Sequence, residues 1–147
     1  MLKKIYYYLE RKEDFAVETT LATRSLKNII SKAHELGYFV TILYFWIDDP
    51  QIAVQRVRAR VEAGGHDVPE QIIRRRYAKG LVYFFDSYKN VADRWMLLDN
   101  TTIPFKLIAQ GWKDNMVVKD NRKYEAIERI AGKLAASIAT NGDTIEE

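Results

Sequence analysis

The residues best suited to chemistry stand in one block after a pair of glycines. Gly64 and Gly65 come first, His66 follows, and three consecutive arginines occupy positions 74–76. A planar guanidinium binds two phosphate oxygens at once, and a glycine pair lets a loop bend over a ligand. Arginine runs on helices also occur as solvated faces. The block is therefore a phosphate-binding lid or an exposed helix start, and the residues by themselves favour the exposed helix.

Helical geometry limits how many of these arginines reach one phosphate. Ile73 and Tyr77 set the buried side of the predicted helix. At about 100° per residue, Arg75 points most nearly away from that side. Arg74 and Arg76 then flank Arg75 on opposite sides. At most two of the three are expected to meet one ligand.

A second basic group precedes the glycine pair. Arg56 and Arg60 are four residues apart and share a helix face, whereas Arg58 points elsewhere. Together with Lys79 and the arginine triplet they concentrate positive charge between residues 56 and 79, although the net charge of the chain is only +3. A local field of this kind attracts phosphate groups.

Polar side chains follow three of the predicted strands. They are Glu18-Thr19-Thr20, Asp48-Asp49 and Asp99-Asn100-Thr101. Open parallel sheets bind ligands at the carboxyl ends of their strands, so these groups are candidate ligand contacts. Each also has a structural interpretation. Glu18 can pair with an arginine or cap a turn, Asp49 can cap a helix, and Asp99 with Asn100 can form a turn.

The elements that position these residues alternate between helix and strand. Helices are expected over residues 1–12, 25–36, 50–62, 69–88 and 122–140, and strands over 15–18, 38–47, 94–99 and 105–111. The continuous apolar run at 38–47 is typical of a strand buried on both faces. The order predicts a single α/β domain over 1–140, with a parallel sheet and helices on both faces. A lid-like basic segment spans 56–90, and a polar tail spans 141–147.

The composition excludes several classes of protein. The 147 residues include no cysteine, which removes disulfide and thiolate chemistry. His34 and His66 lack the spacing of metal ligands, so no metal site is predicted. No window approaches the roughly 18 apolar residues of a membrane span, and the first residues do not read as a signal peptide. A cytoplasmic protein without membrane partners is expected.

Taken together, these motifs resemble the zeta-toxin-like P-loop kinases, in the bacterial branch described as predicted ATPases. The resemblance runs from Phe15 to Thr102 and rests on three stretches: Glu18-Thr19-Thr20-Leu21, the block from Gly64 to Tyr77, and the strand at 92–100. It implies a P-loop NTPase fold of the nucleoside-kinase type. It also implies transfer of the γ-phosphate of ATP, with Mg²⁺, to a hydroxyl of a small molecule such as a UDP-activated N-acetyl sugar.

The same resemblance implies roles for individual residues. Glu18 matches the strand-end glutamate that helps to hold the substrate. The other substrate contacts would be Thr19, Thr20, His66, Arg56 and Arg76. Arg60, Arg74 and Arg75 would stabilise the transferring phosphoryl group. Asp99 and Asn100 would contact the nucleotide, and an antitoxin protein would be a partner.

The chain departs from this family in one respect. It contains no G-x-x-x-x-G-K-[ST] loop, and its one Gly-Lys pair, Gly132-Lys133, is followed by Leu134. The family's phosphate-binding loop and acidic catalytic base would both fall upstream of Met1. A start within a helix, with no strand before it, also indicates a missing strand–helix unit. The 147 residues by themselves are therefore expected not to transfer phosphate.

Two other functions compete with the kinase hypothesis. The basic region 56–79 would suit a nucleic-acid-binding module, but the nearly balanced charge and the lack of an aromatic stacking face weigh against it. The chain would otherwise be a non-catalytic interaction protein, for example a dimer formed through the sheet edge that a missing unit leaves exposed.

Overall fold

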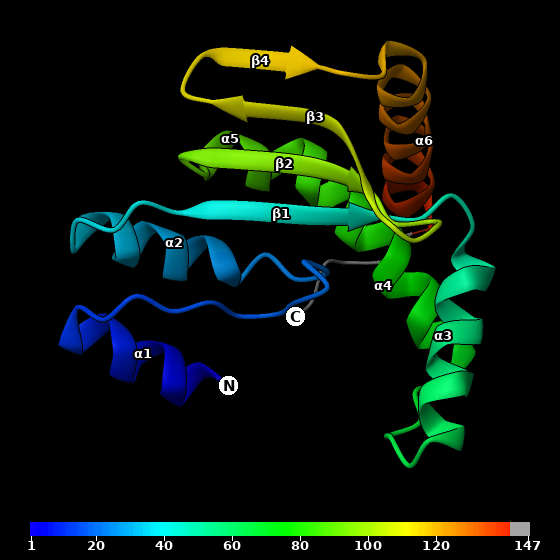
Figure 1. The fold of residues 1–147 in the computed structure, drawn as a ribbon, viewed down its shortest axis with the longest axis horizontal. Helices are drawn as coiled ribbons and strands as arrows, with labels where there is room; N and C mark the ends of the chain where they lie inside the picture. Colours follow the sequence, from blue (N-terminus) through cyan, green and yellow to red (C-terminus); the bar gives the residue numbers. More distant parts are fainter. Residues whose placement is uncertain (142–147) are drawn as a thin grey trace.

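The computed structural model describes residues 1–141, and Figure 1 shows their mixed α/β arrangement. The helices are α1 (Leu2–Arg11), α2 (Leu26–Glu35), α3 (Pro50–Glu62), α4 (Glu70–Tyr83), the π-helix η1 (Phe84–Tyr88), α5 (Lys89–Val91) and α6 (Asn121–Thr140). The strands are β1 (Thr41–Trp46), β2 (Arg94–Asp99), β3 (Lys106–Trp112) and β4 (Asn115–Val118). From residue 142 onward, the tail expected over 141–147 lies outside the described residues.

The four strands form one sheet in the order β1-β2-β3-β4. β1 and β2 are parallel, but β2 with β3 and β3 with β4 are antiparallel. The prediction of a parallel sheet is therefore wrong beyond the first pair. The chain turns back after β3 at Lys113, whose φ of 52° lies in the left-handed region. β4 was missed because it is only four residues long and largely exposed, and so lacks the apolar run of a buried strand.

The strand predicted over residues 15–18 does not form. Figure 1 shows this segment as an extended trace that runs in the same direction as β1. Residues 14–20 form no backbone hydrogen bond with any other residue in the described part of the chain. The apolar pattern is present, but a strand also needs a neighbouring edge to pair with. Glu18 therefore does not end a buried strand.

The core lies on one face of the sheet only. Helices α4 and α6 and the π-helix η1 pack there, and Figure 1 shows α5 and the upper part of α4 behind the strands. On β1 the buried residues Ile42 and Trp46 face this core, whereas Leu43 and Phe45 are 50% and 44% exposed. The predictions that this strand is buried on both faces and that helices cover both faces are thus wrong for residues 1–141.

The predicted helix starts and stops are confirmed. Asp49 caps α3 by accepting a hydrogen bond from the Gln51 N–H at 2.8 Å. Gly37 follows α2 with a φ of 85°, and Gly64 follows α3 with a φ of 93°. α4 begins directly after Pro69. Among these same residues, no helix has the length and apolar content required to cross a membrane.

Helix α6 packs on the core through one narrow stripe. Ile127 is fully buried, whereas Ile130 is 37% exposed. Tyr124 and Ala131 are buried as well. Residues spaced by three, four and seven share one helix face, so Tyr124, Ile127 and Ala131 form a single buried stripe.

Candidate functional site

The loops after β1 and β2 meet at the carboxyl end of the parallel pair. The Asn100 N–H donates to the Trp46 carbonyl at 2.7 Å, and the Asp48 N–H donates to Thr101 Oγ1 at 3.1 Å. Arg56 of α3 donates through Nη2 to the Asn100 carbonyl at 2.7 Å. The fold thus brings two predicted site residues, Arg56 and Asn100, into direct contact. The Arg56 guanidinium contacts the loop only through backbone oxygens, so its other N–H groups can bind a further acceptor.

Asp99, the last residue of β2, is held by a partner from α6. Lys123 Nζ lies 2.7 Å from Asp99 Oδ2, and the Thr101 N–H donates to Oδ1 at 3.0 Å. Burial would raise the pKa of Asp99, but the hydrogen bonds from Lys123 and Thr101 hold this pKa below its ordinary value. The sequence reading missed Lys123. The sequence feature that could have indicated Lys123 is its position in the first turn of α6, three residues after the capping residue Asp120.

Replacing Asp99 by asparagine is expected to lower the free energy of unfolding by roughly 1–3 kcal/mol at pH 7, since a charge-assisted hydrogen bond is lost. Because the folded pKa is lowered, this stabilisation is complete above the unfolded value of about 3.9 and disappears as the pH falls through the folded pKa. Urea unfolding at pH 7, 5 and 3 measures the difference. Asp114→Asn, in an exposed turn, is the matched control and should change little. A difference at pH 3 as large as that at pH 7 would contradict this role of Asp99.

Tyr77 of α4 closes the same end of the sheet from the core side. Its hydroxyl donates to the Ile47 carbonyl at 2.8 Å. Burial raises the pKa of Tyr77, the nearby indole of Trp46 lowers it, and the carboxylates of Asp48 and Asp49 raise it further. Trp46 Nε1 lies close to this phenol but outside hydrogen-bond geometry, and it has no acceptor among the described residues. Tyr77 is therefore a neutral hydrogen-bond donor at neutral pH.

The arginine triplet divides between two sides of α4, as helical geometry predicts. Arg74 donates from Nε to Glu70 Oε1 at 2.9 Å and from Nη2 to Gln51 Oε1 at 2.5 Å. Arg58 donates to the same glutamate at 3.4 Å. These contacts join α3 to α4. Arg74, expected to be catalytic, therefore has a structural role in this conformation.

Arg76 is exposed on α4, one helical turn before the residue that contacts Thr20. It shares a helix face with Gly80, four residues later. A Cβ atom on Gly80 would come within 2.3 Å of the Thr20 carbonyl oxygen, so this face of α4 touches the segment directly. Helical spacing thus puts Arg76 one turn from Thr20. Glu18 is exposed and forms no ion pair with any residue of 1–141.

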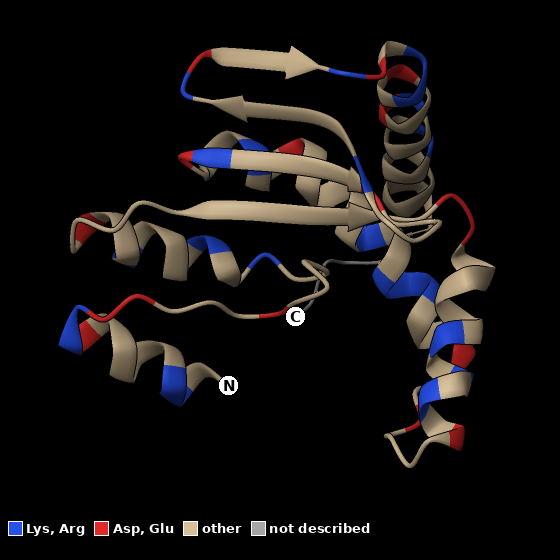
Figure 2. Ribbon diagram, in the orientation of Figure 1, with Lys and Arg blue, Asp and Glu red and all other residues tan. Residues whose placement is uncertain are grey.

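His66 and Arg60 lie at the opposite end of the α3–α4 hairpin. His66 is exposed in the turn. The Gly65 N–H donates to the Arg60 carbonyl at 2.8 Å, and a Cβ on Gly65 would meet Arg60 Cγ at 2.6 Å. Figure 2 shows that the basic residues are spread along both helices rather than gathered at one point. His66 and Arg60 are therefore not brought to the strand ends in this conformation.

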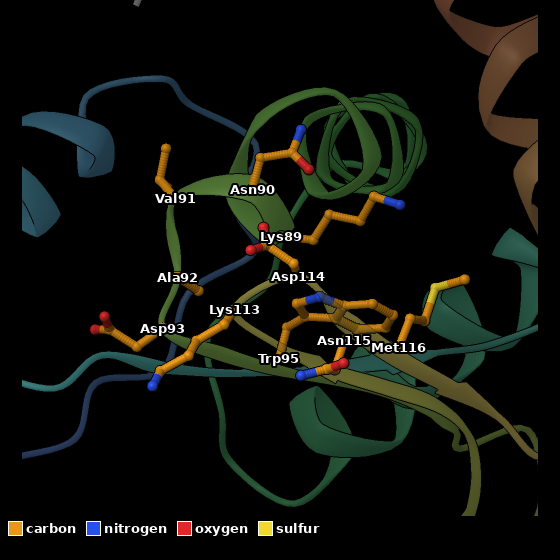
Figure 3. Close-up of a pocket in the computed structure, with 10 residues that line it drawn as sticks. All are labelled: Lys89, Asn90, Val91, Ala92, Asp93, Trp95, Lys113, Asp114, Asn115 and Met116. Carbon is orange, nitrogen blue, oxygen red and sulfur yellow. The ribbon is translucent and has the colours of Figure 1, made fainter.

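The larger of two described cavities lies at the other end of the sheet. It encloses about 500 Å³, and Figure 3 shows its lining, which includes Trp95, Lys89 and Asp93. Lys89 Nζ sits 5.2–5.9 Å from the ring centroids of Phe85, Trp95 and Tyr124. Asp93 accepts hydrogen bonds from the Val40 N–H at 2.6 Å and pairs with His34 at 2.8 Å. Two charged groups of this cavity, Lys89 and Asp93, are thus already engaged within the protein.

A second cavity of about 400 Å³ adjoins the carboxyl end of the parallel pair. Its lining includes Trp46, Lys123, Ile127 and Ile130, together with Asp120, Arg122 and Ala126. It is smaller than the first cavity, but it lies beside the Asp99–Lys123 ion pair. The strand-end region is therefore the better candidate site, because it combines a cavity with the convergent polar groups named above.

Comparison with known proteins gives one informative similarity. A protein of Haemophilus influenzae, itself named only as uncharacterized, is 32% identical over 72 residues. The aligned stretch is 49% of this chain, and the chain spans about half, 51%, of that relative. No protein-family model matches the sequence. No solved structure matches it either.

Proposed function

We propose that this chain carries the substrate-binding and arginine-bearing side of a zeta-toxin-like, ATP-dependent kinase with a P-loop NTPase fold. The reaction would transfer a phosphoryl group to a hydroxyl of a small molecule such as a UDP-activated amino sugar. The phosphate-binding loop would come from a segment outside these residues, since they contain no such motif. A cytoplasmic location and an antitoxin partner belong to the same proposal.

One observation supports this function most. Arg76 on α4 lies one turn from the contact with Thr20, and Arg56 on α3 contacts the Asn100 loop. Helices α3 and α4 therefore each carry an arginine near the carboxyl end of the parallel strands, where open parallel sheets bind ligands. Arginine forks at this position suit the oxygens of a phosphate or diphosphate, and Glu18 and Thr19 offer acceptors and donors for a sugar hydroxyl.

The nucleotide and its metal would be held mainly by other residues. No group of three histidine, aspartate or glutamate side chains among residues 1–141 has the geometry to bind a metal ion. Residues 1–141 therefore do not fit Mg²⁺ by themselves. The contribution of this chain is to bind the acceptor and to neutralise phosphate charge through Arg76 and Arg56.

The adjacent arginines Arg75 and Arg76 provide a matched test. Isothermal titration of the 147-residue protein with UDP-N-acetylglucosamine is expected to detect weak binding. Arg76→Ala should weaken this binding roughly tenfold or more, because a charge-assisted hydrogen bond is lost. Arg75→Ala removes an equal charge from the outer side of α4 and should have little effect. Equal losses in both variants would indicate only non-specific attraction, and no binding by the unmodified chain would contradict the proposal.

The location of the phosphate-binding loop is tested separately. Intact mass of the protein from its own cells gives the N-terminus of the natural polypeptide. A start upstream of Met1 that adds a glycine-rich loop ending in Lys-Ser or Lys-Thr would support kinase activity within one chain. In such a protein, Glu18→Lys is expected to abolish transfer. Unchanged transfer would remove Glu18 from the substrate site.

A further inference from the structure

One face of the four-stranded sheet is left open. Residues paired between neighbouring strands share a face, and so do residues two apart along one strand. The strand register therefore identifies the side chains on the face opposite the core. They include Leu43, Phe45, Met96, Gln110, Trp112 and Val117. In Figure 1 this face lies in front, with α5 and the upper part of α4 behind the strands.

The open face is a large apolar surface. Its members Leu43, Phe45, Trp112 and Val117 are each between 44% and 51% exposed. Phe105, which is 55% exposed, extends the surface because its ring meets that of Phe45 edge-on at 5.3 Å. Since a whole aromatic side chain has about 150–250 Å², these five residues expose roughly 450 Å². The largest patch on a typical monomer is about 300–600 Å² and often marks an interaction site.

The whole face has the area of a protein interface. Thr41, Arg94 and Asn115 share the face with the apolar residues and are also exposed. With them the face presents roughly 700 Å², close to the 800 Å² or so that each partner buries in an interface of standard size. A second four-stranded sheet has the same extent and can cover this face completely, at the usual spacing of about 10 Å between packed sheets. A second copy of the chain supplies such a sheet.

The charge of the face also suits a second copy. Arg94 is the one charged side chain that the register places on this face within residues 1–141. Its Nη2 donates to Gln110 Oε1 at 3.2 Å, which holds the guanidinium along the sheet. A second copy therefore meets little like charge, whereas a strongly acidic or basic partner meets little complementary charge. Aromatic residues, methionine and arginine are the types enriched at protein interfaces.

The two ends of the face complement each other. Arg94 and Trp112 are paired at one end, and the rings of Phe45 and Phe105 meet at the other. A two-fold axis that runs across the strands, midway between two packed sheets, lays the first end of each copy on the second end of its partner. The strands of the two sheets then run in opposite directions, as aligned sheet packing allows. Arg94 of one copy thereby meets the aromatic rings of the other, a favourable cation–π contact.

We propose that the open face of the sheet binds the same face of a second copy, forming a two-fold symmetric dimer by sheet-on-sheet packing. The contact uses the face of the sheet and leaves the edge of β1 free. Because the area is at the low end of the standard size, a dissociation constant of roughly 10–100 μM is expected, and the chain is mainly monomeric at a few micromolar. This inference rests on the open face and does not depend on the proposed kinase function.

Two measurements on the 147-residue protein test the dimer. Sedimentation velocity between about 1 and 500 μM should show a shift from one to two chains per particle. Tryptophan fluorescence reports which surface is covered, because Trp112 is 51% exposed whereas Trp46 and Trp95 are each 6% exposed. Quenching by acrylamide therefore arises mainly from Trp112. This quenching should fall over the same concentration range, since the dimer covers the Trp112 indole.

Adjacent residues of β4 supply a matched control. Val117 lies on the open face and Met116 on the opposite face, and they are 47% and 52% exposed. Leu43→Lys at the centre of the face should weaken the dimer at least tenfold, and Val117→Lys several-fold, because the dimer would bury an unpaired charge. Met116→Lys adds the same charge outside the interface and should leave the dimer unchanged. Circular dichroism should show an intact fold for all three variants, since each replaced side chain is exposed.

Arg94 tests the relative orientation of the two sheets. Arg94→Lys keeps the cation over the aromatic rings of the other copy and should weaken the dimer by less than about threefold. Arg94→Glu places a carboxylate against the same rings and should weaken it at least tenfold. Equal effects of these two variants would contradict the arrangement in which the strands of the two sheets run in opposite directions.

Several results would overturn the proposal. A protein that remains monomeric up to about 500 μM would show that a second copy does not cover the face. A dimer that withstands Leu43→Lys and leaves Trp112 quenching unchanged would use another surface, such as the free edge of β1. Equal weakening by Val117→Lys and Met116→Lys would mean that added charge, and not the open face, controls association.

Discussion

Phe84→Ala is expected to cost roughly 3–5 kcal/mol of unfolding free energy, the range for removing a fully buried phenylalanine. Phe84 has no exposed surface. Its ring stacks on Tyr44 with centroids 4.7 Å apart and meets Trp95 edge-on at 5.9 Å. It thereby joins the π-helix η1 to both parallel strands. Truncation leaves a cavity at the junction of three elements that cannot all close around it.

Phe45→Ala is the matched control for this measurement. Phe45 sits on β1 next to Tyr44, but its side chain is 44% exposed on the uncovered face, where it contacts Phe105. Its loss should cost about 1 kcal/mol or less, because little buried area disappears. Urea unfolding followed by circular dichroism measures both variants. Since a domain of this size is stable by about 5–15 kcal/mol in total, Phe84→Ala should visibly lower the unfolding midpoint. Similar costs for both variants would contradict the one-sided core.

Gly80→Ala is expected to destabilise the protein by roughly 1–3 kcal/mol, although alanine is the better helix former. The added Cβ would lie 2.3 Å from the Thr20 carbonyl oxygen, a backbone atom that moves only with its segment. Either α4 or residues 18–20 must shift. The same shift would move α4, which carries Arg76, relative to Thr20, so the variant should also weaken the binding of UDP-N-acetylglucosamine proposed above.

Gly132→Ala is the control, because it is expected to change the stability of the protein in the opposite direction. Gly132 lies within α6, and a Cβ there would meet nothing within 4 Å. The helix propensity of alanine should then stabilise the protein by about 1 kcal/mol. Thermal and urea unfolding of the two variants should move in opposite directions. Stabilisation of both would mean that residues 18–20 do not hold the position described against α4.

The sequence by itself determined the local structure well. Asp49-Pro50, Gly37, Gly64 and Pro69 mark helix boundaries because they act through their own dihedral angles and nearest neighbours. Helical spacing also predicted that Arg74 and Arg76 lie on opposite sides of α4, and the contact of Arg74 with Gln51 agrees with that. These features depend on residues a few positions apart, so no tertiary information was needed.

The tertiary structure decided which strands pair, which faces are covered and which distant side chains meet. Residues 15–18 have the pattern of a strand, yet they pair with no strand among residues 1–141, and Glu18 is exposed instead of ending a buried strand. The apolar run of β1 predicted burial on both faces, but only neighbouring elements can cover a face, and among residues 1–141 they cover one. Lys123 reached Asp99 from a helix 24 residues away, and Arg56 reached Asn100 across 44 residues. Such contacts depend on how distant segments pack, which local pattern and propensity do not encode.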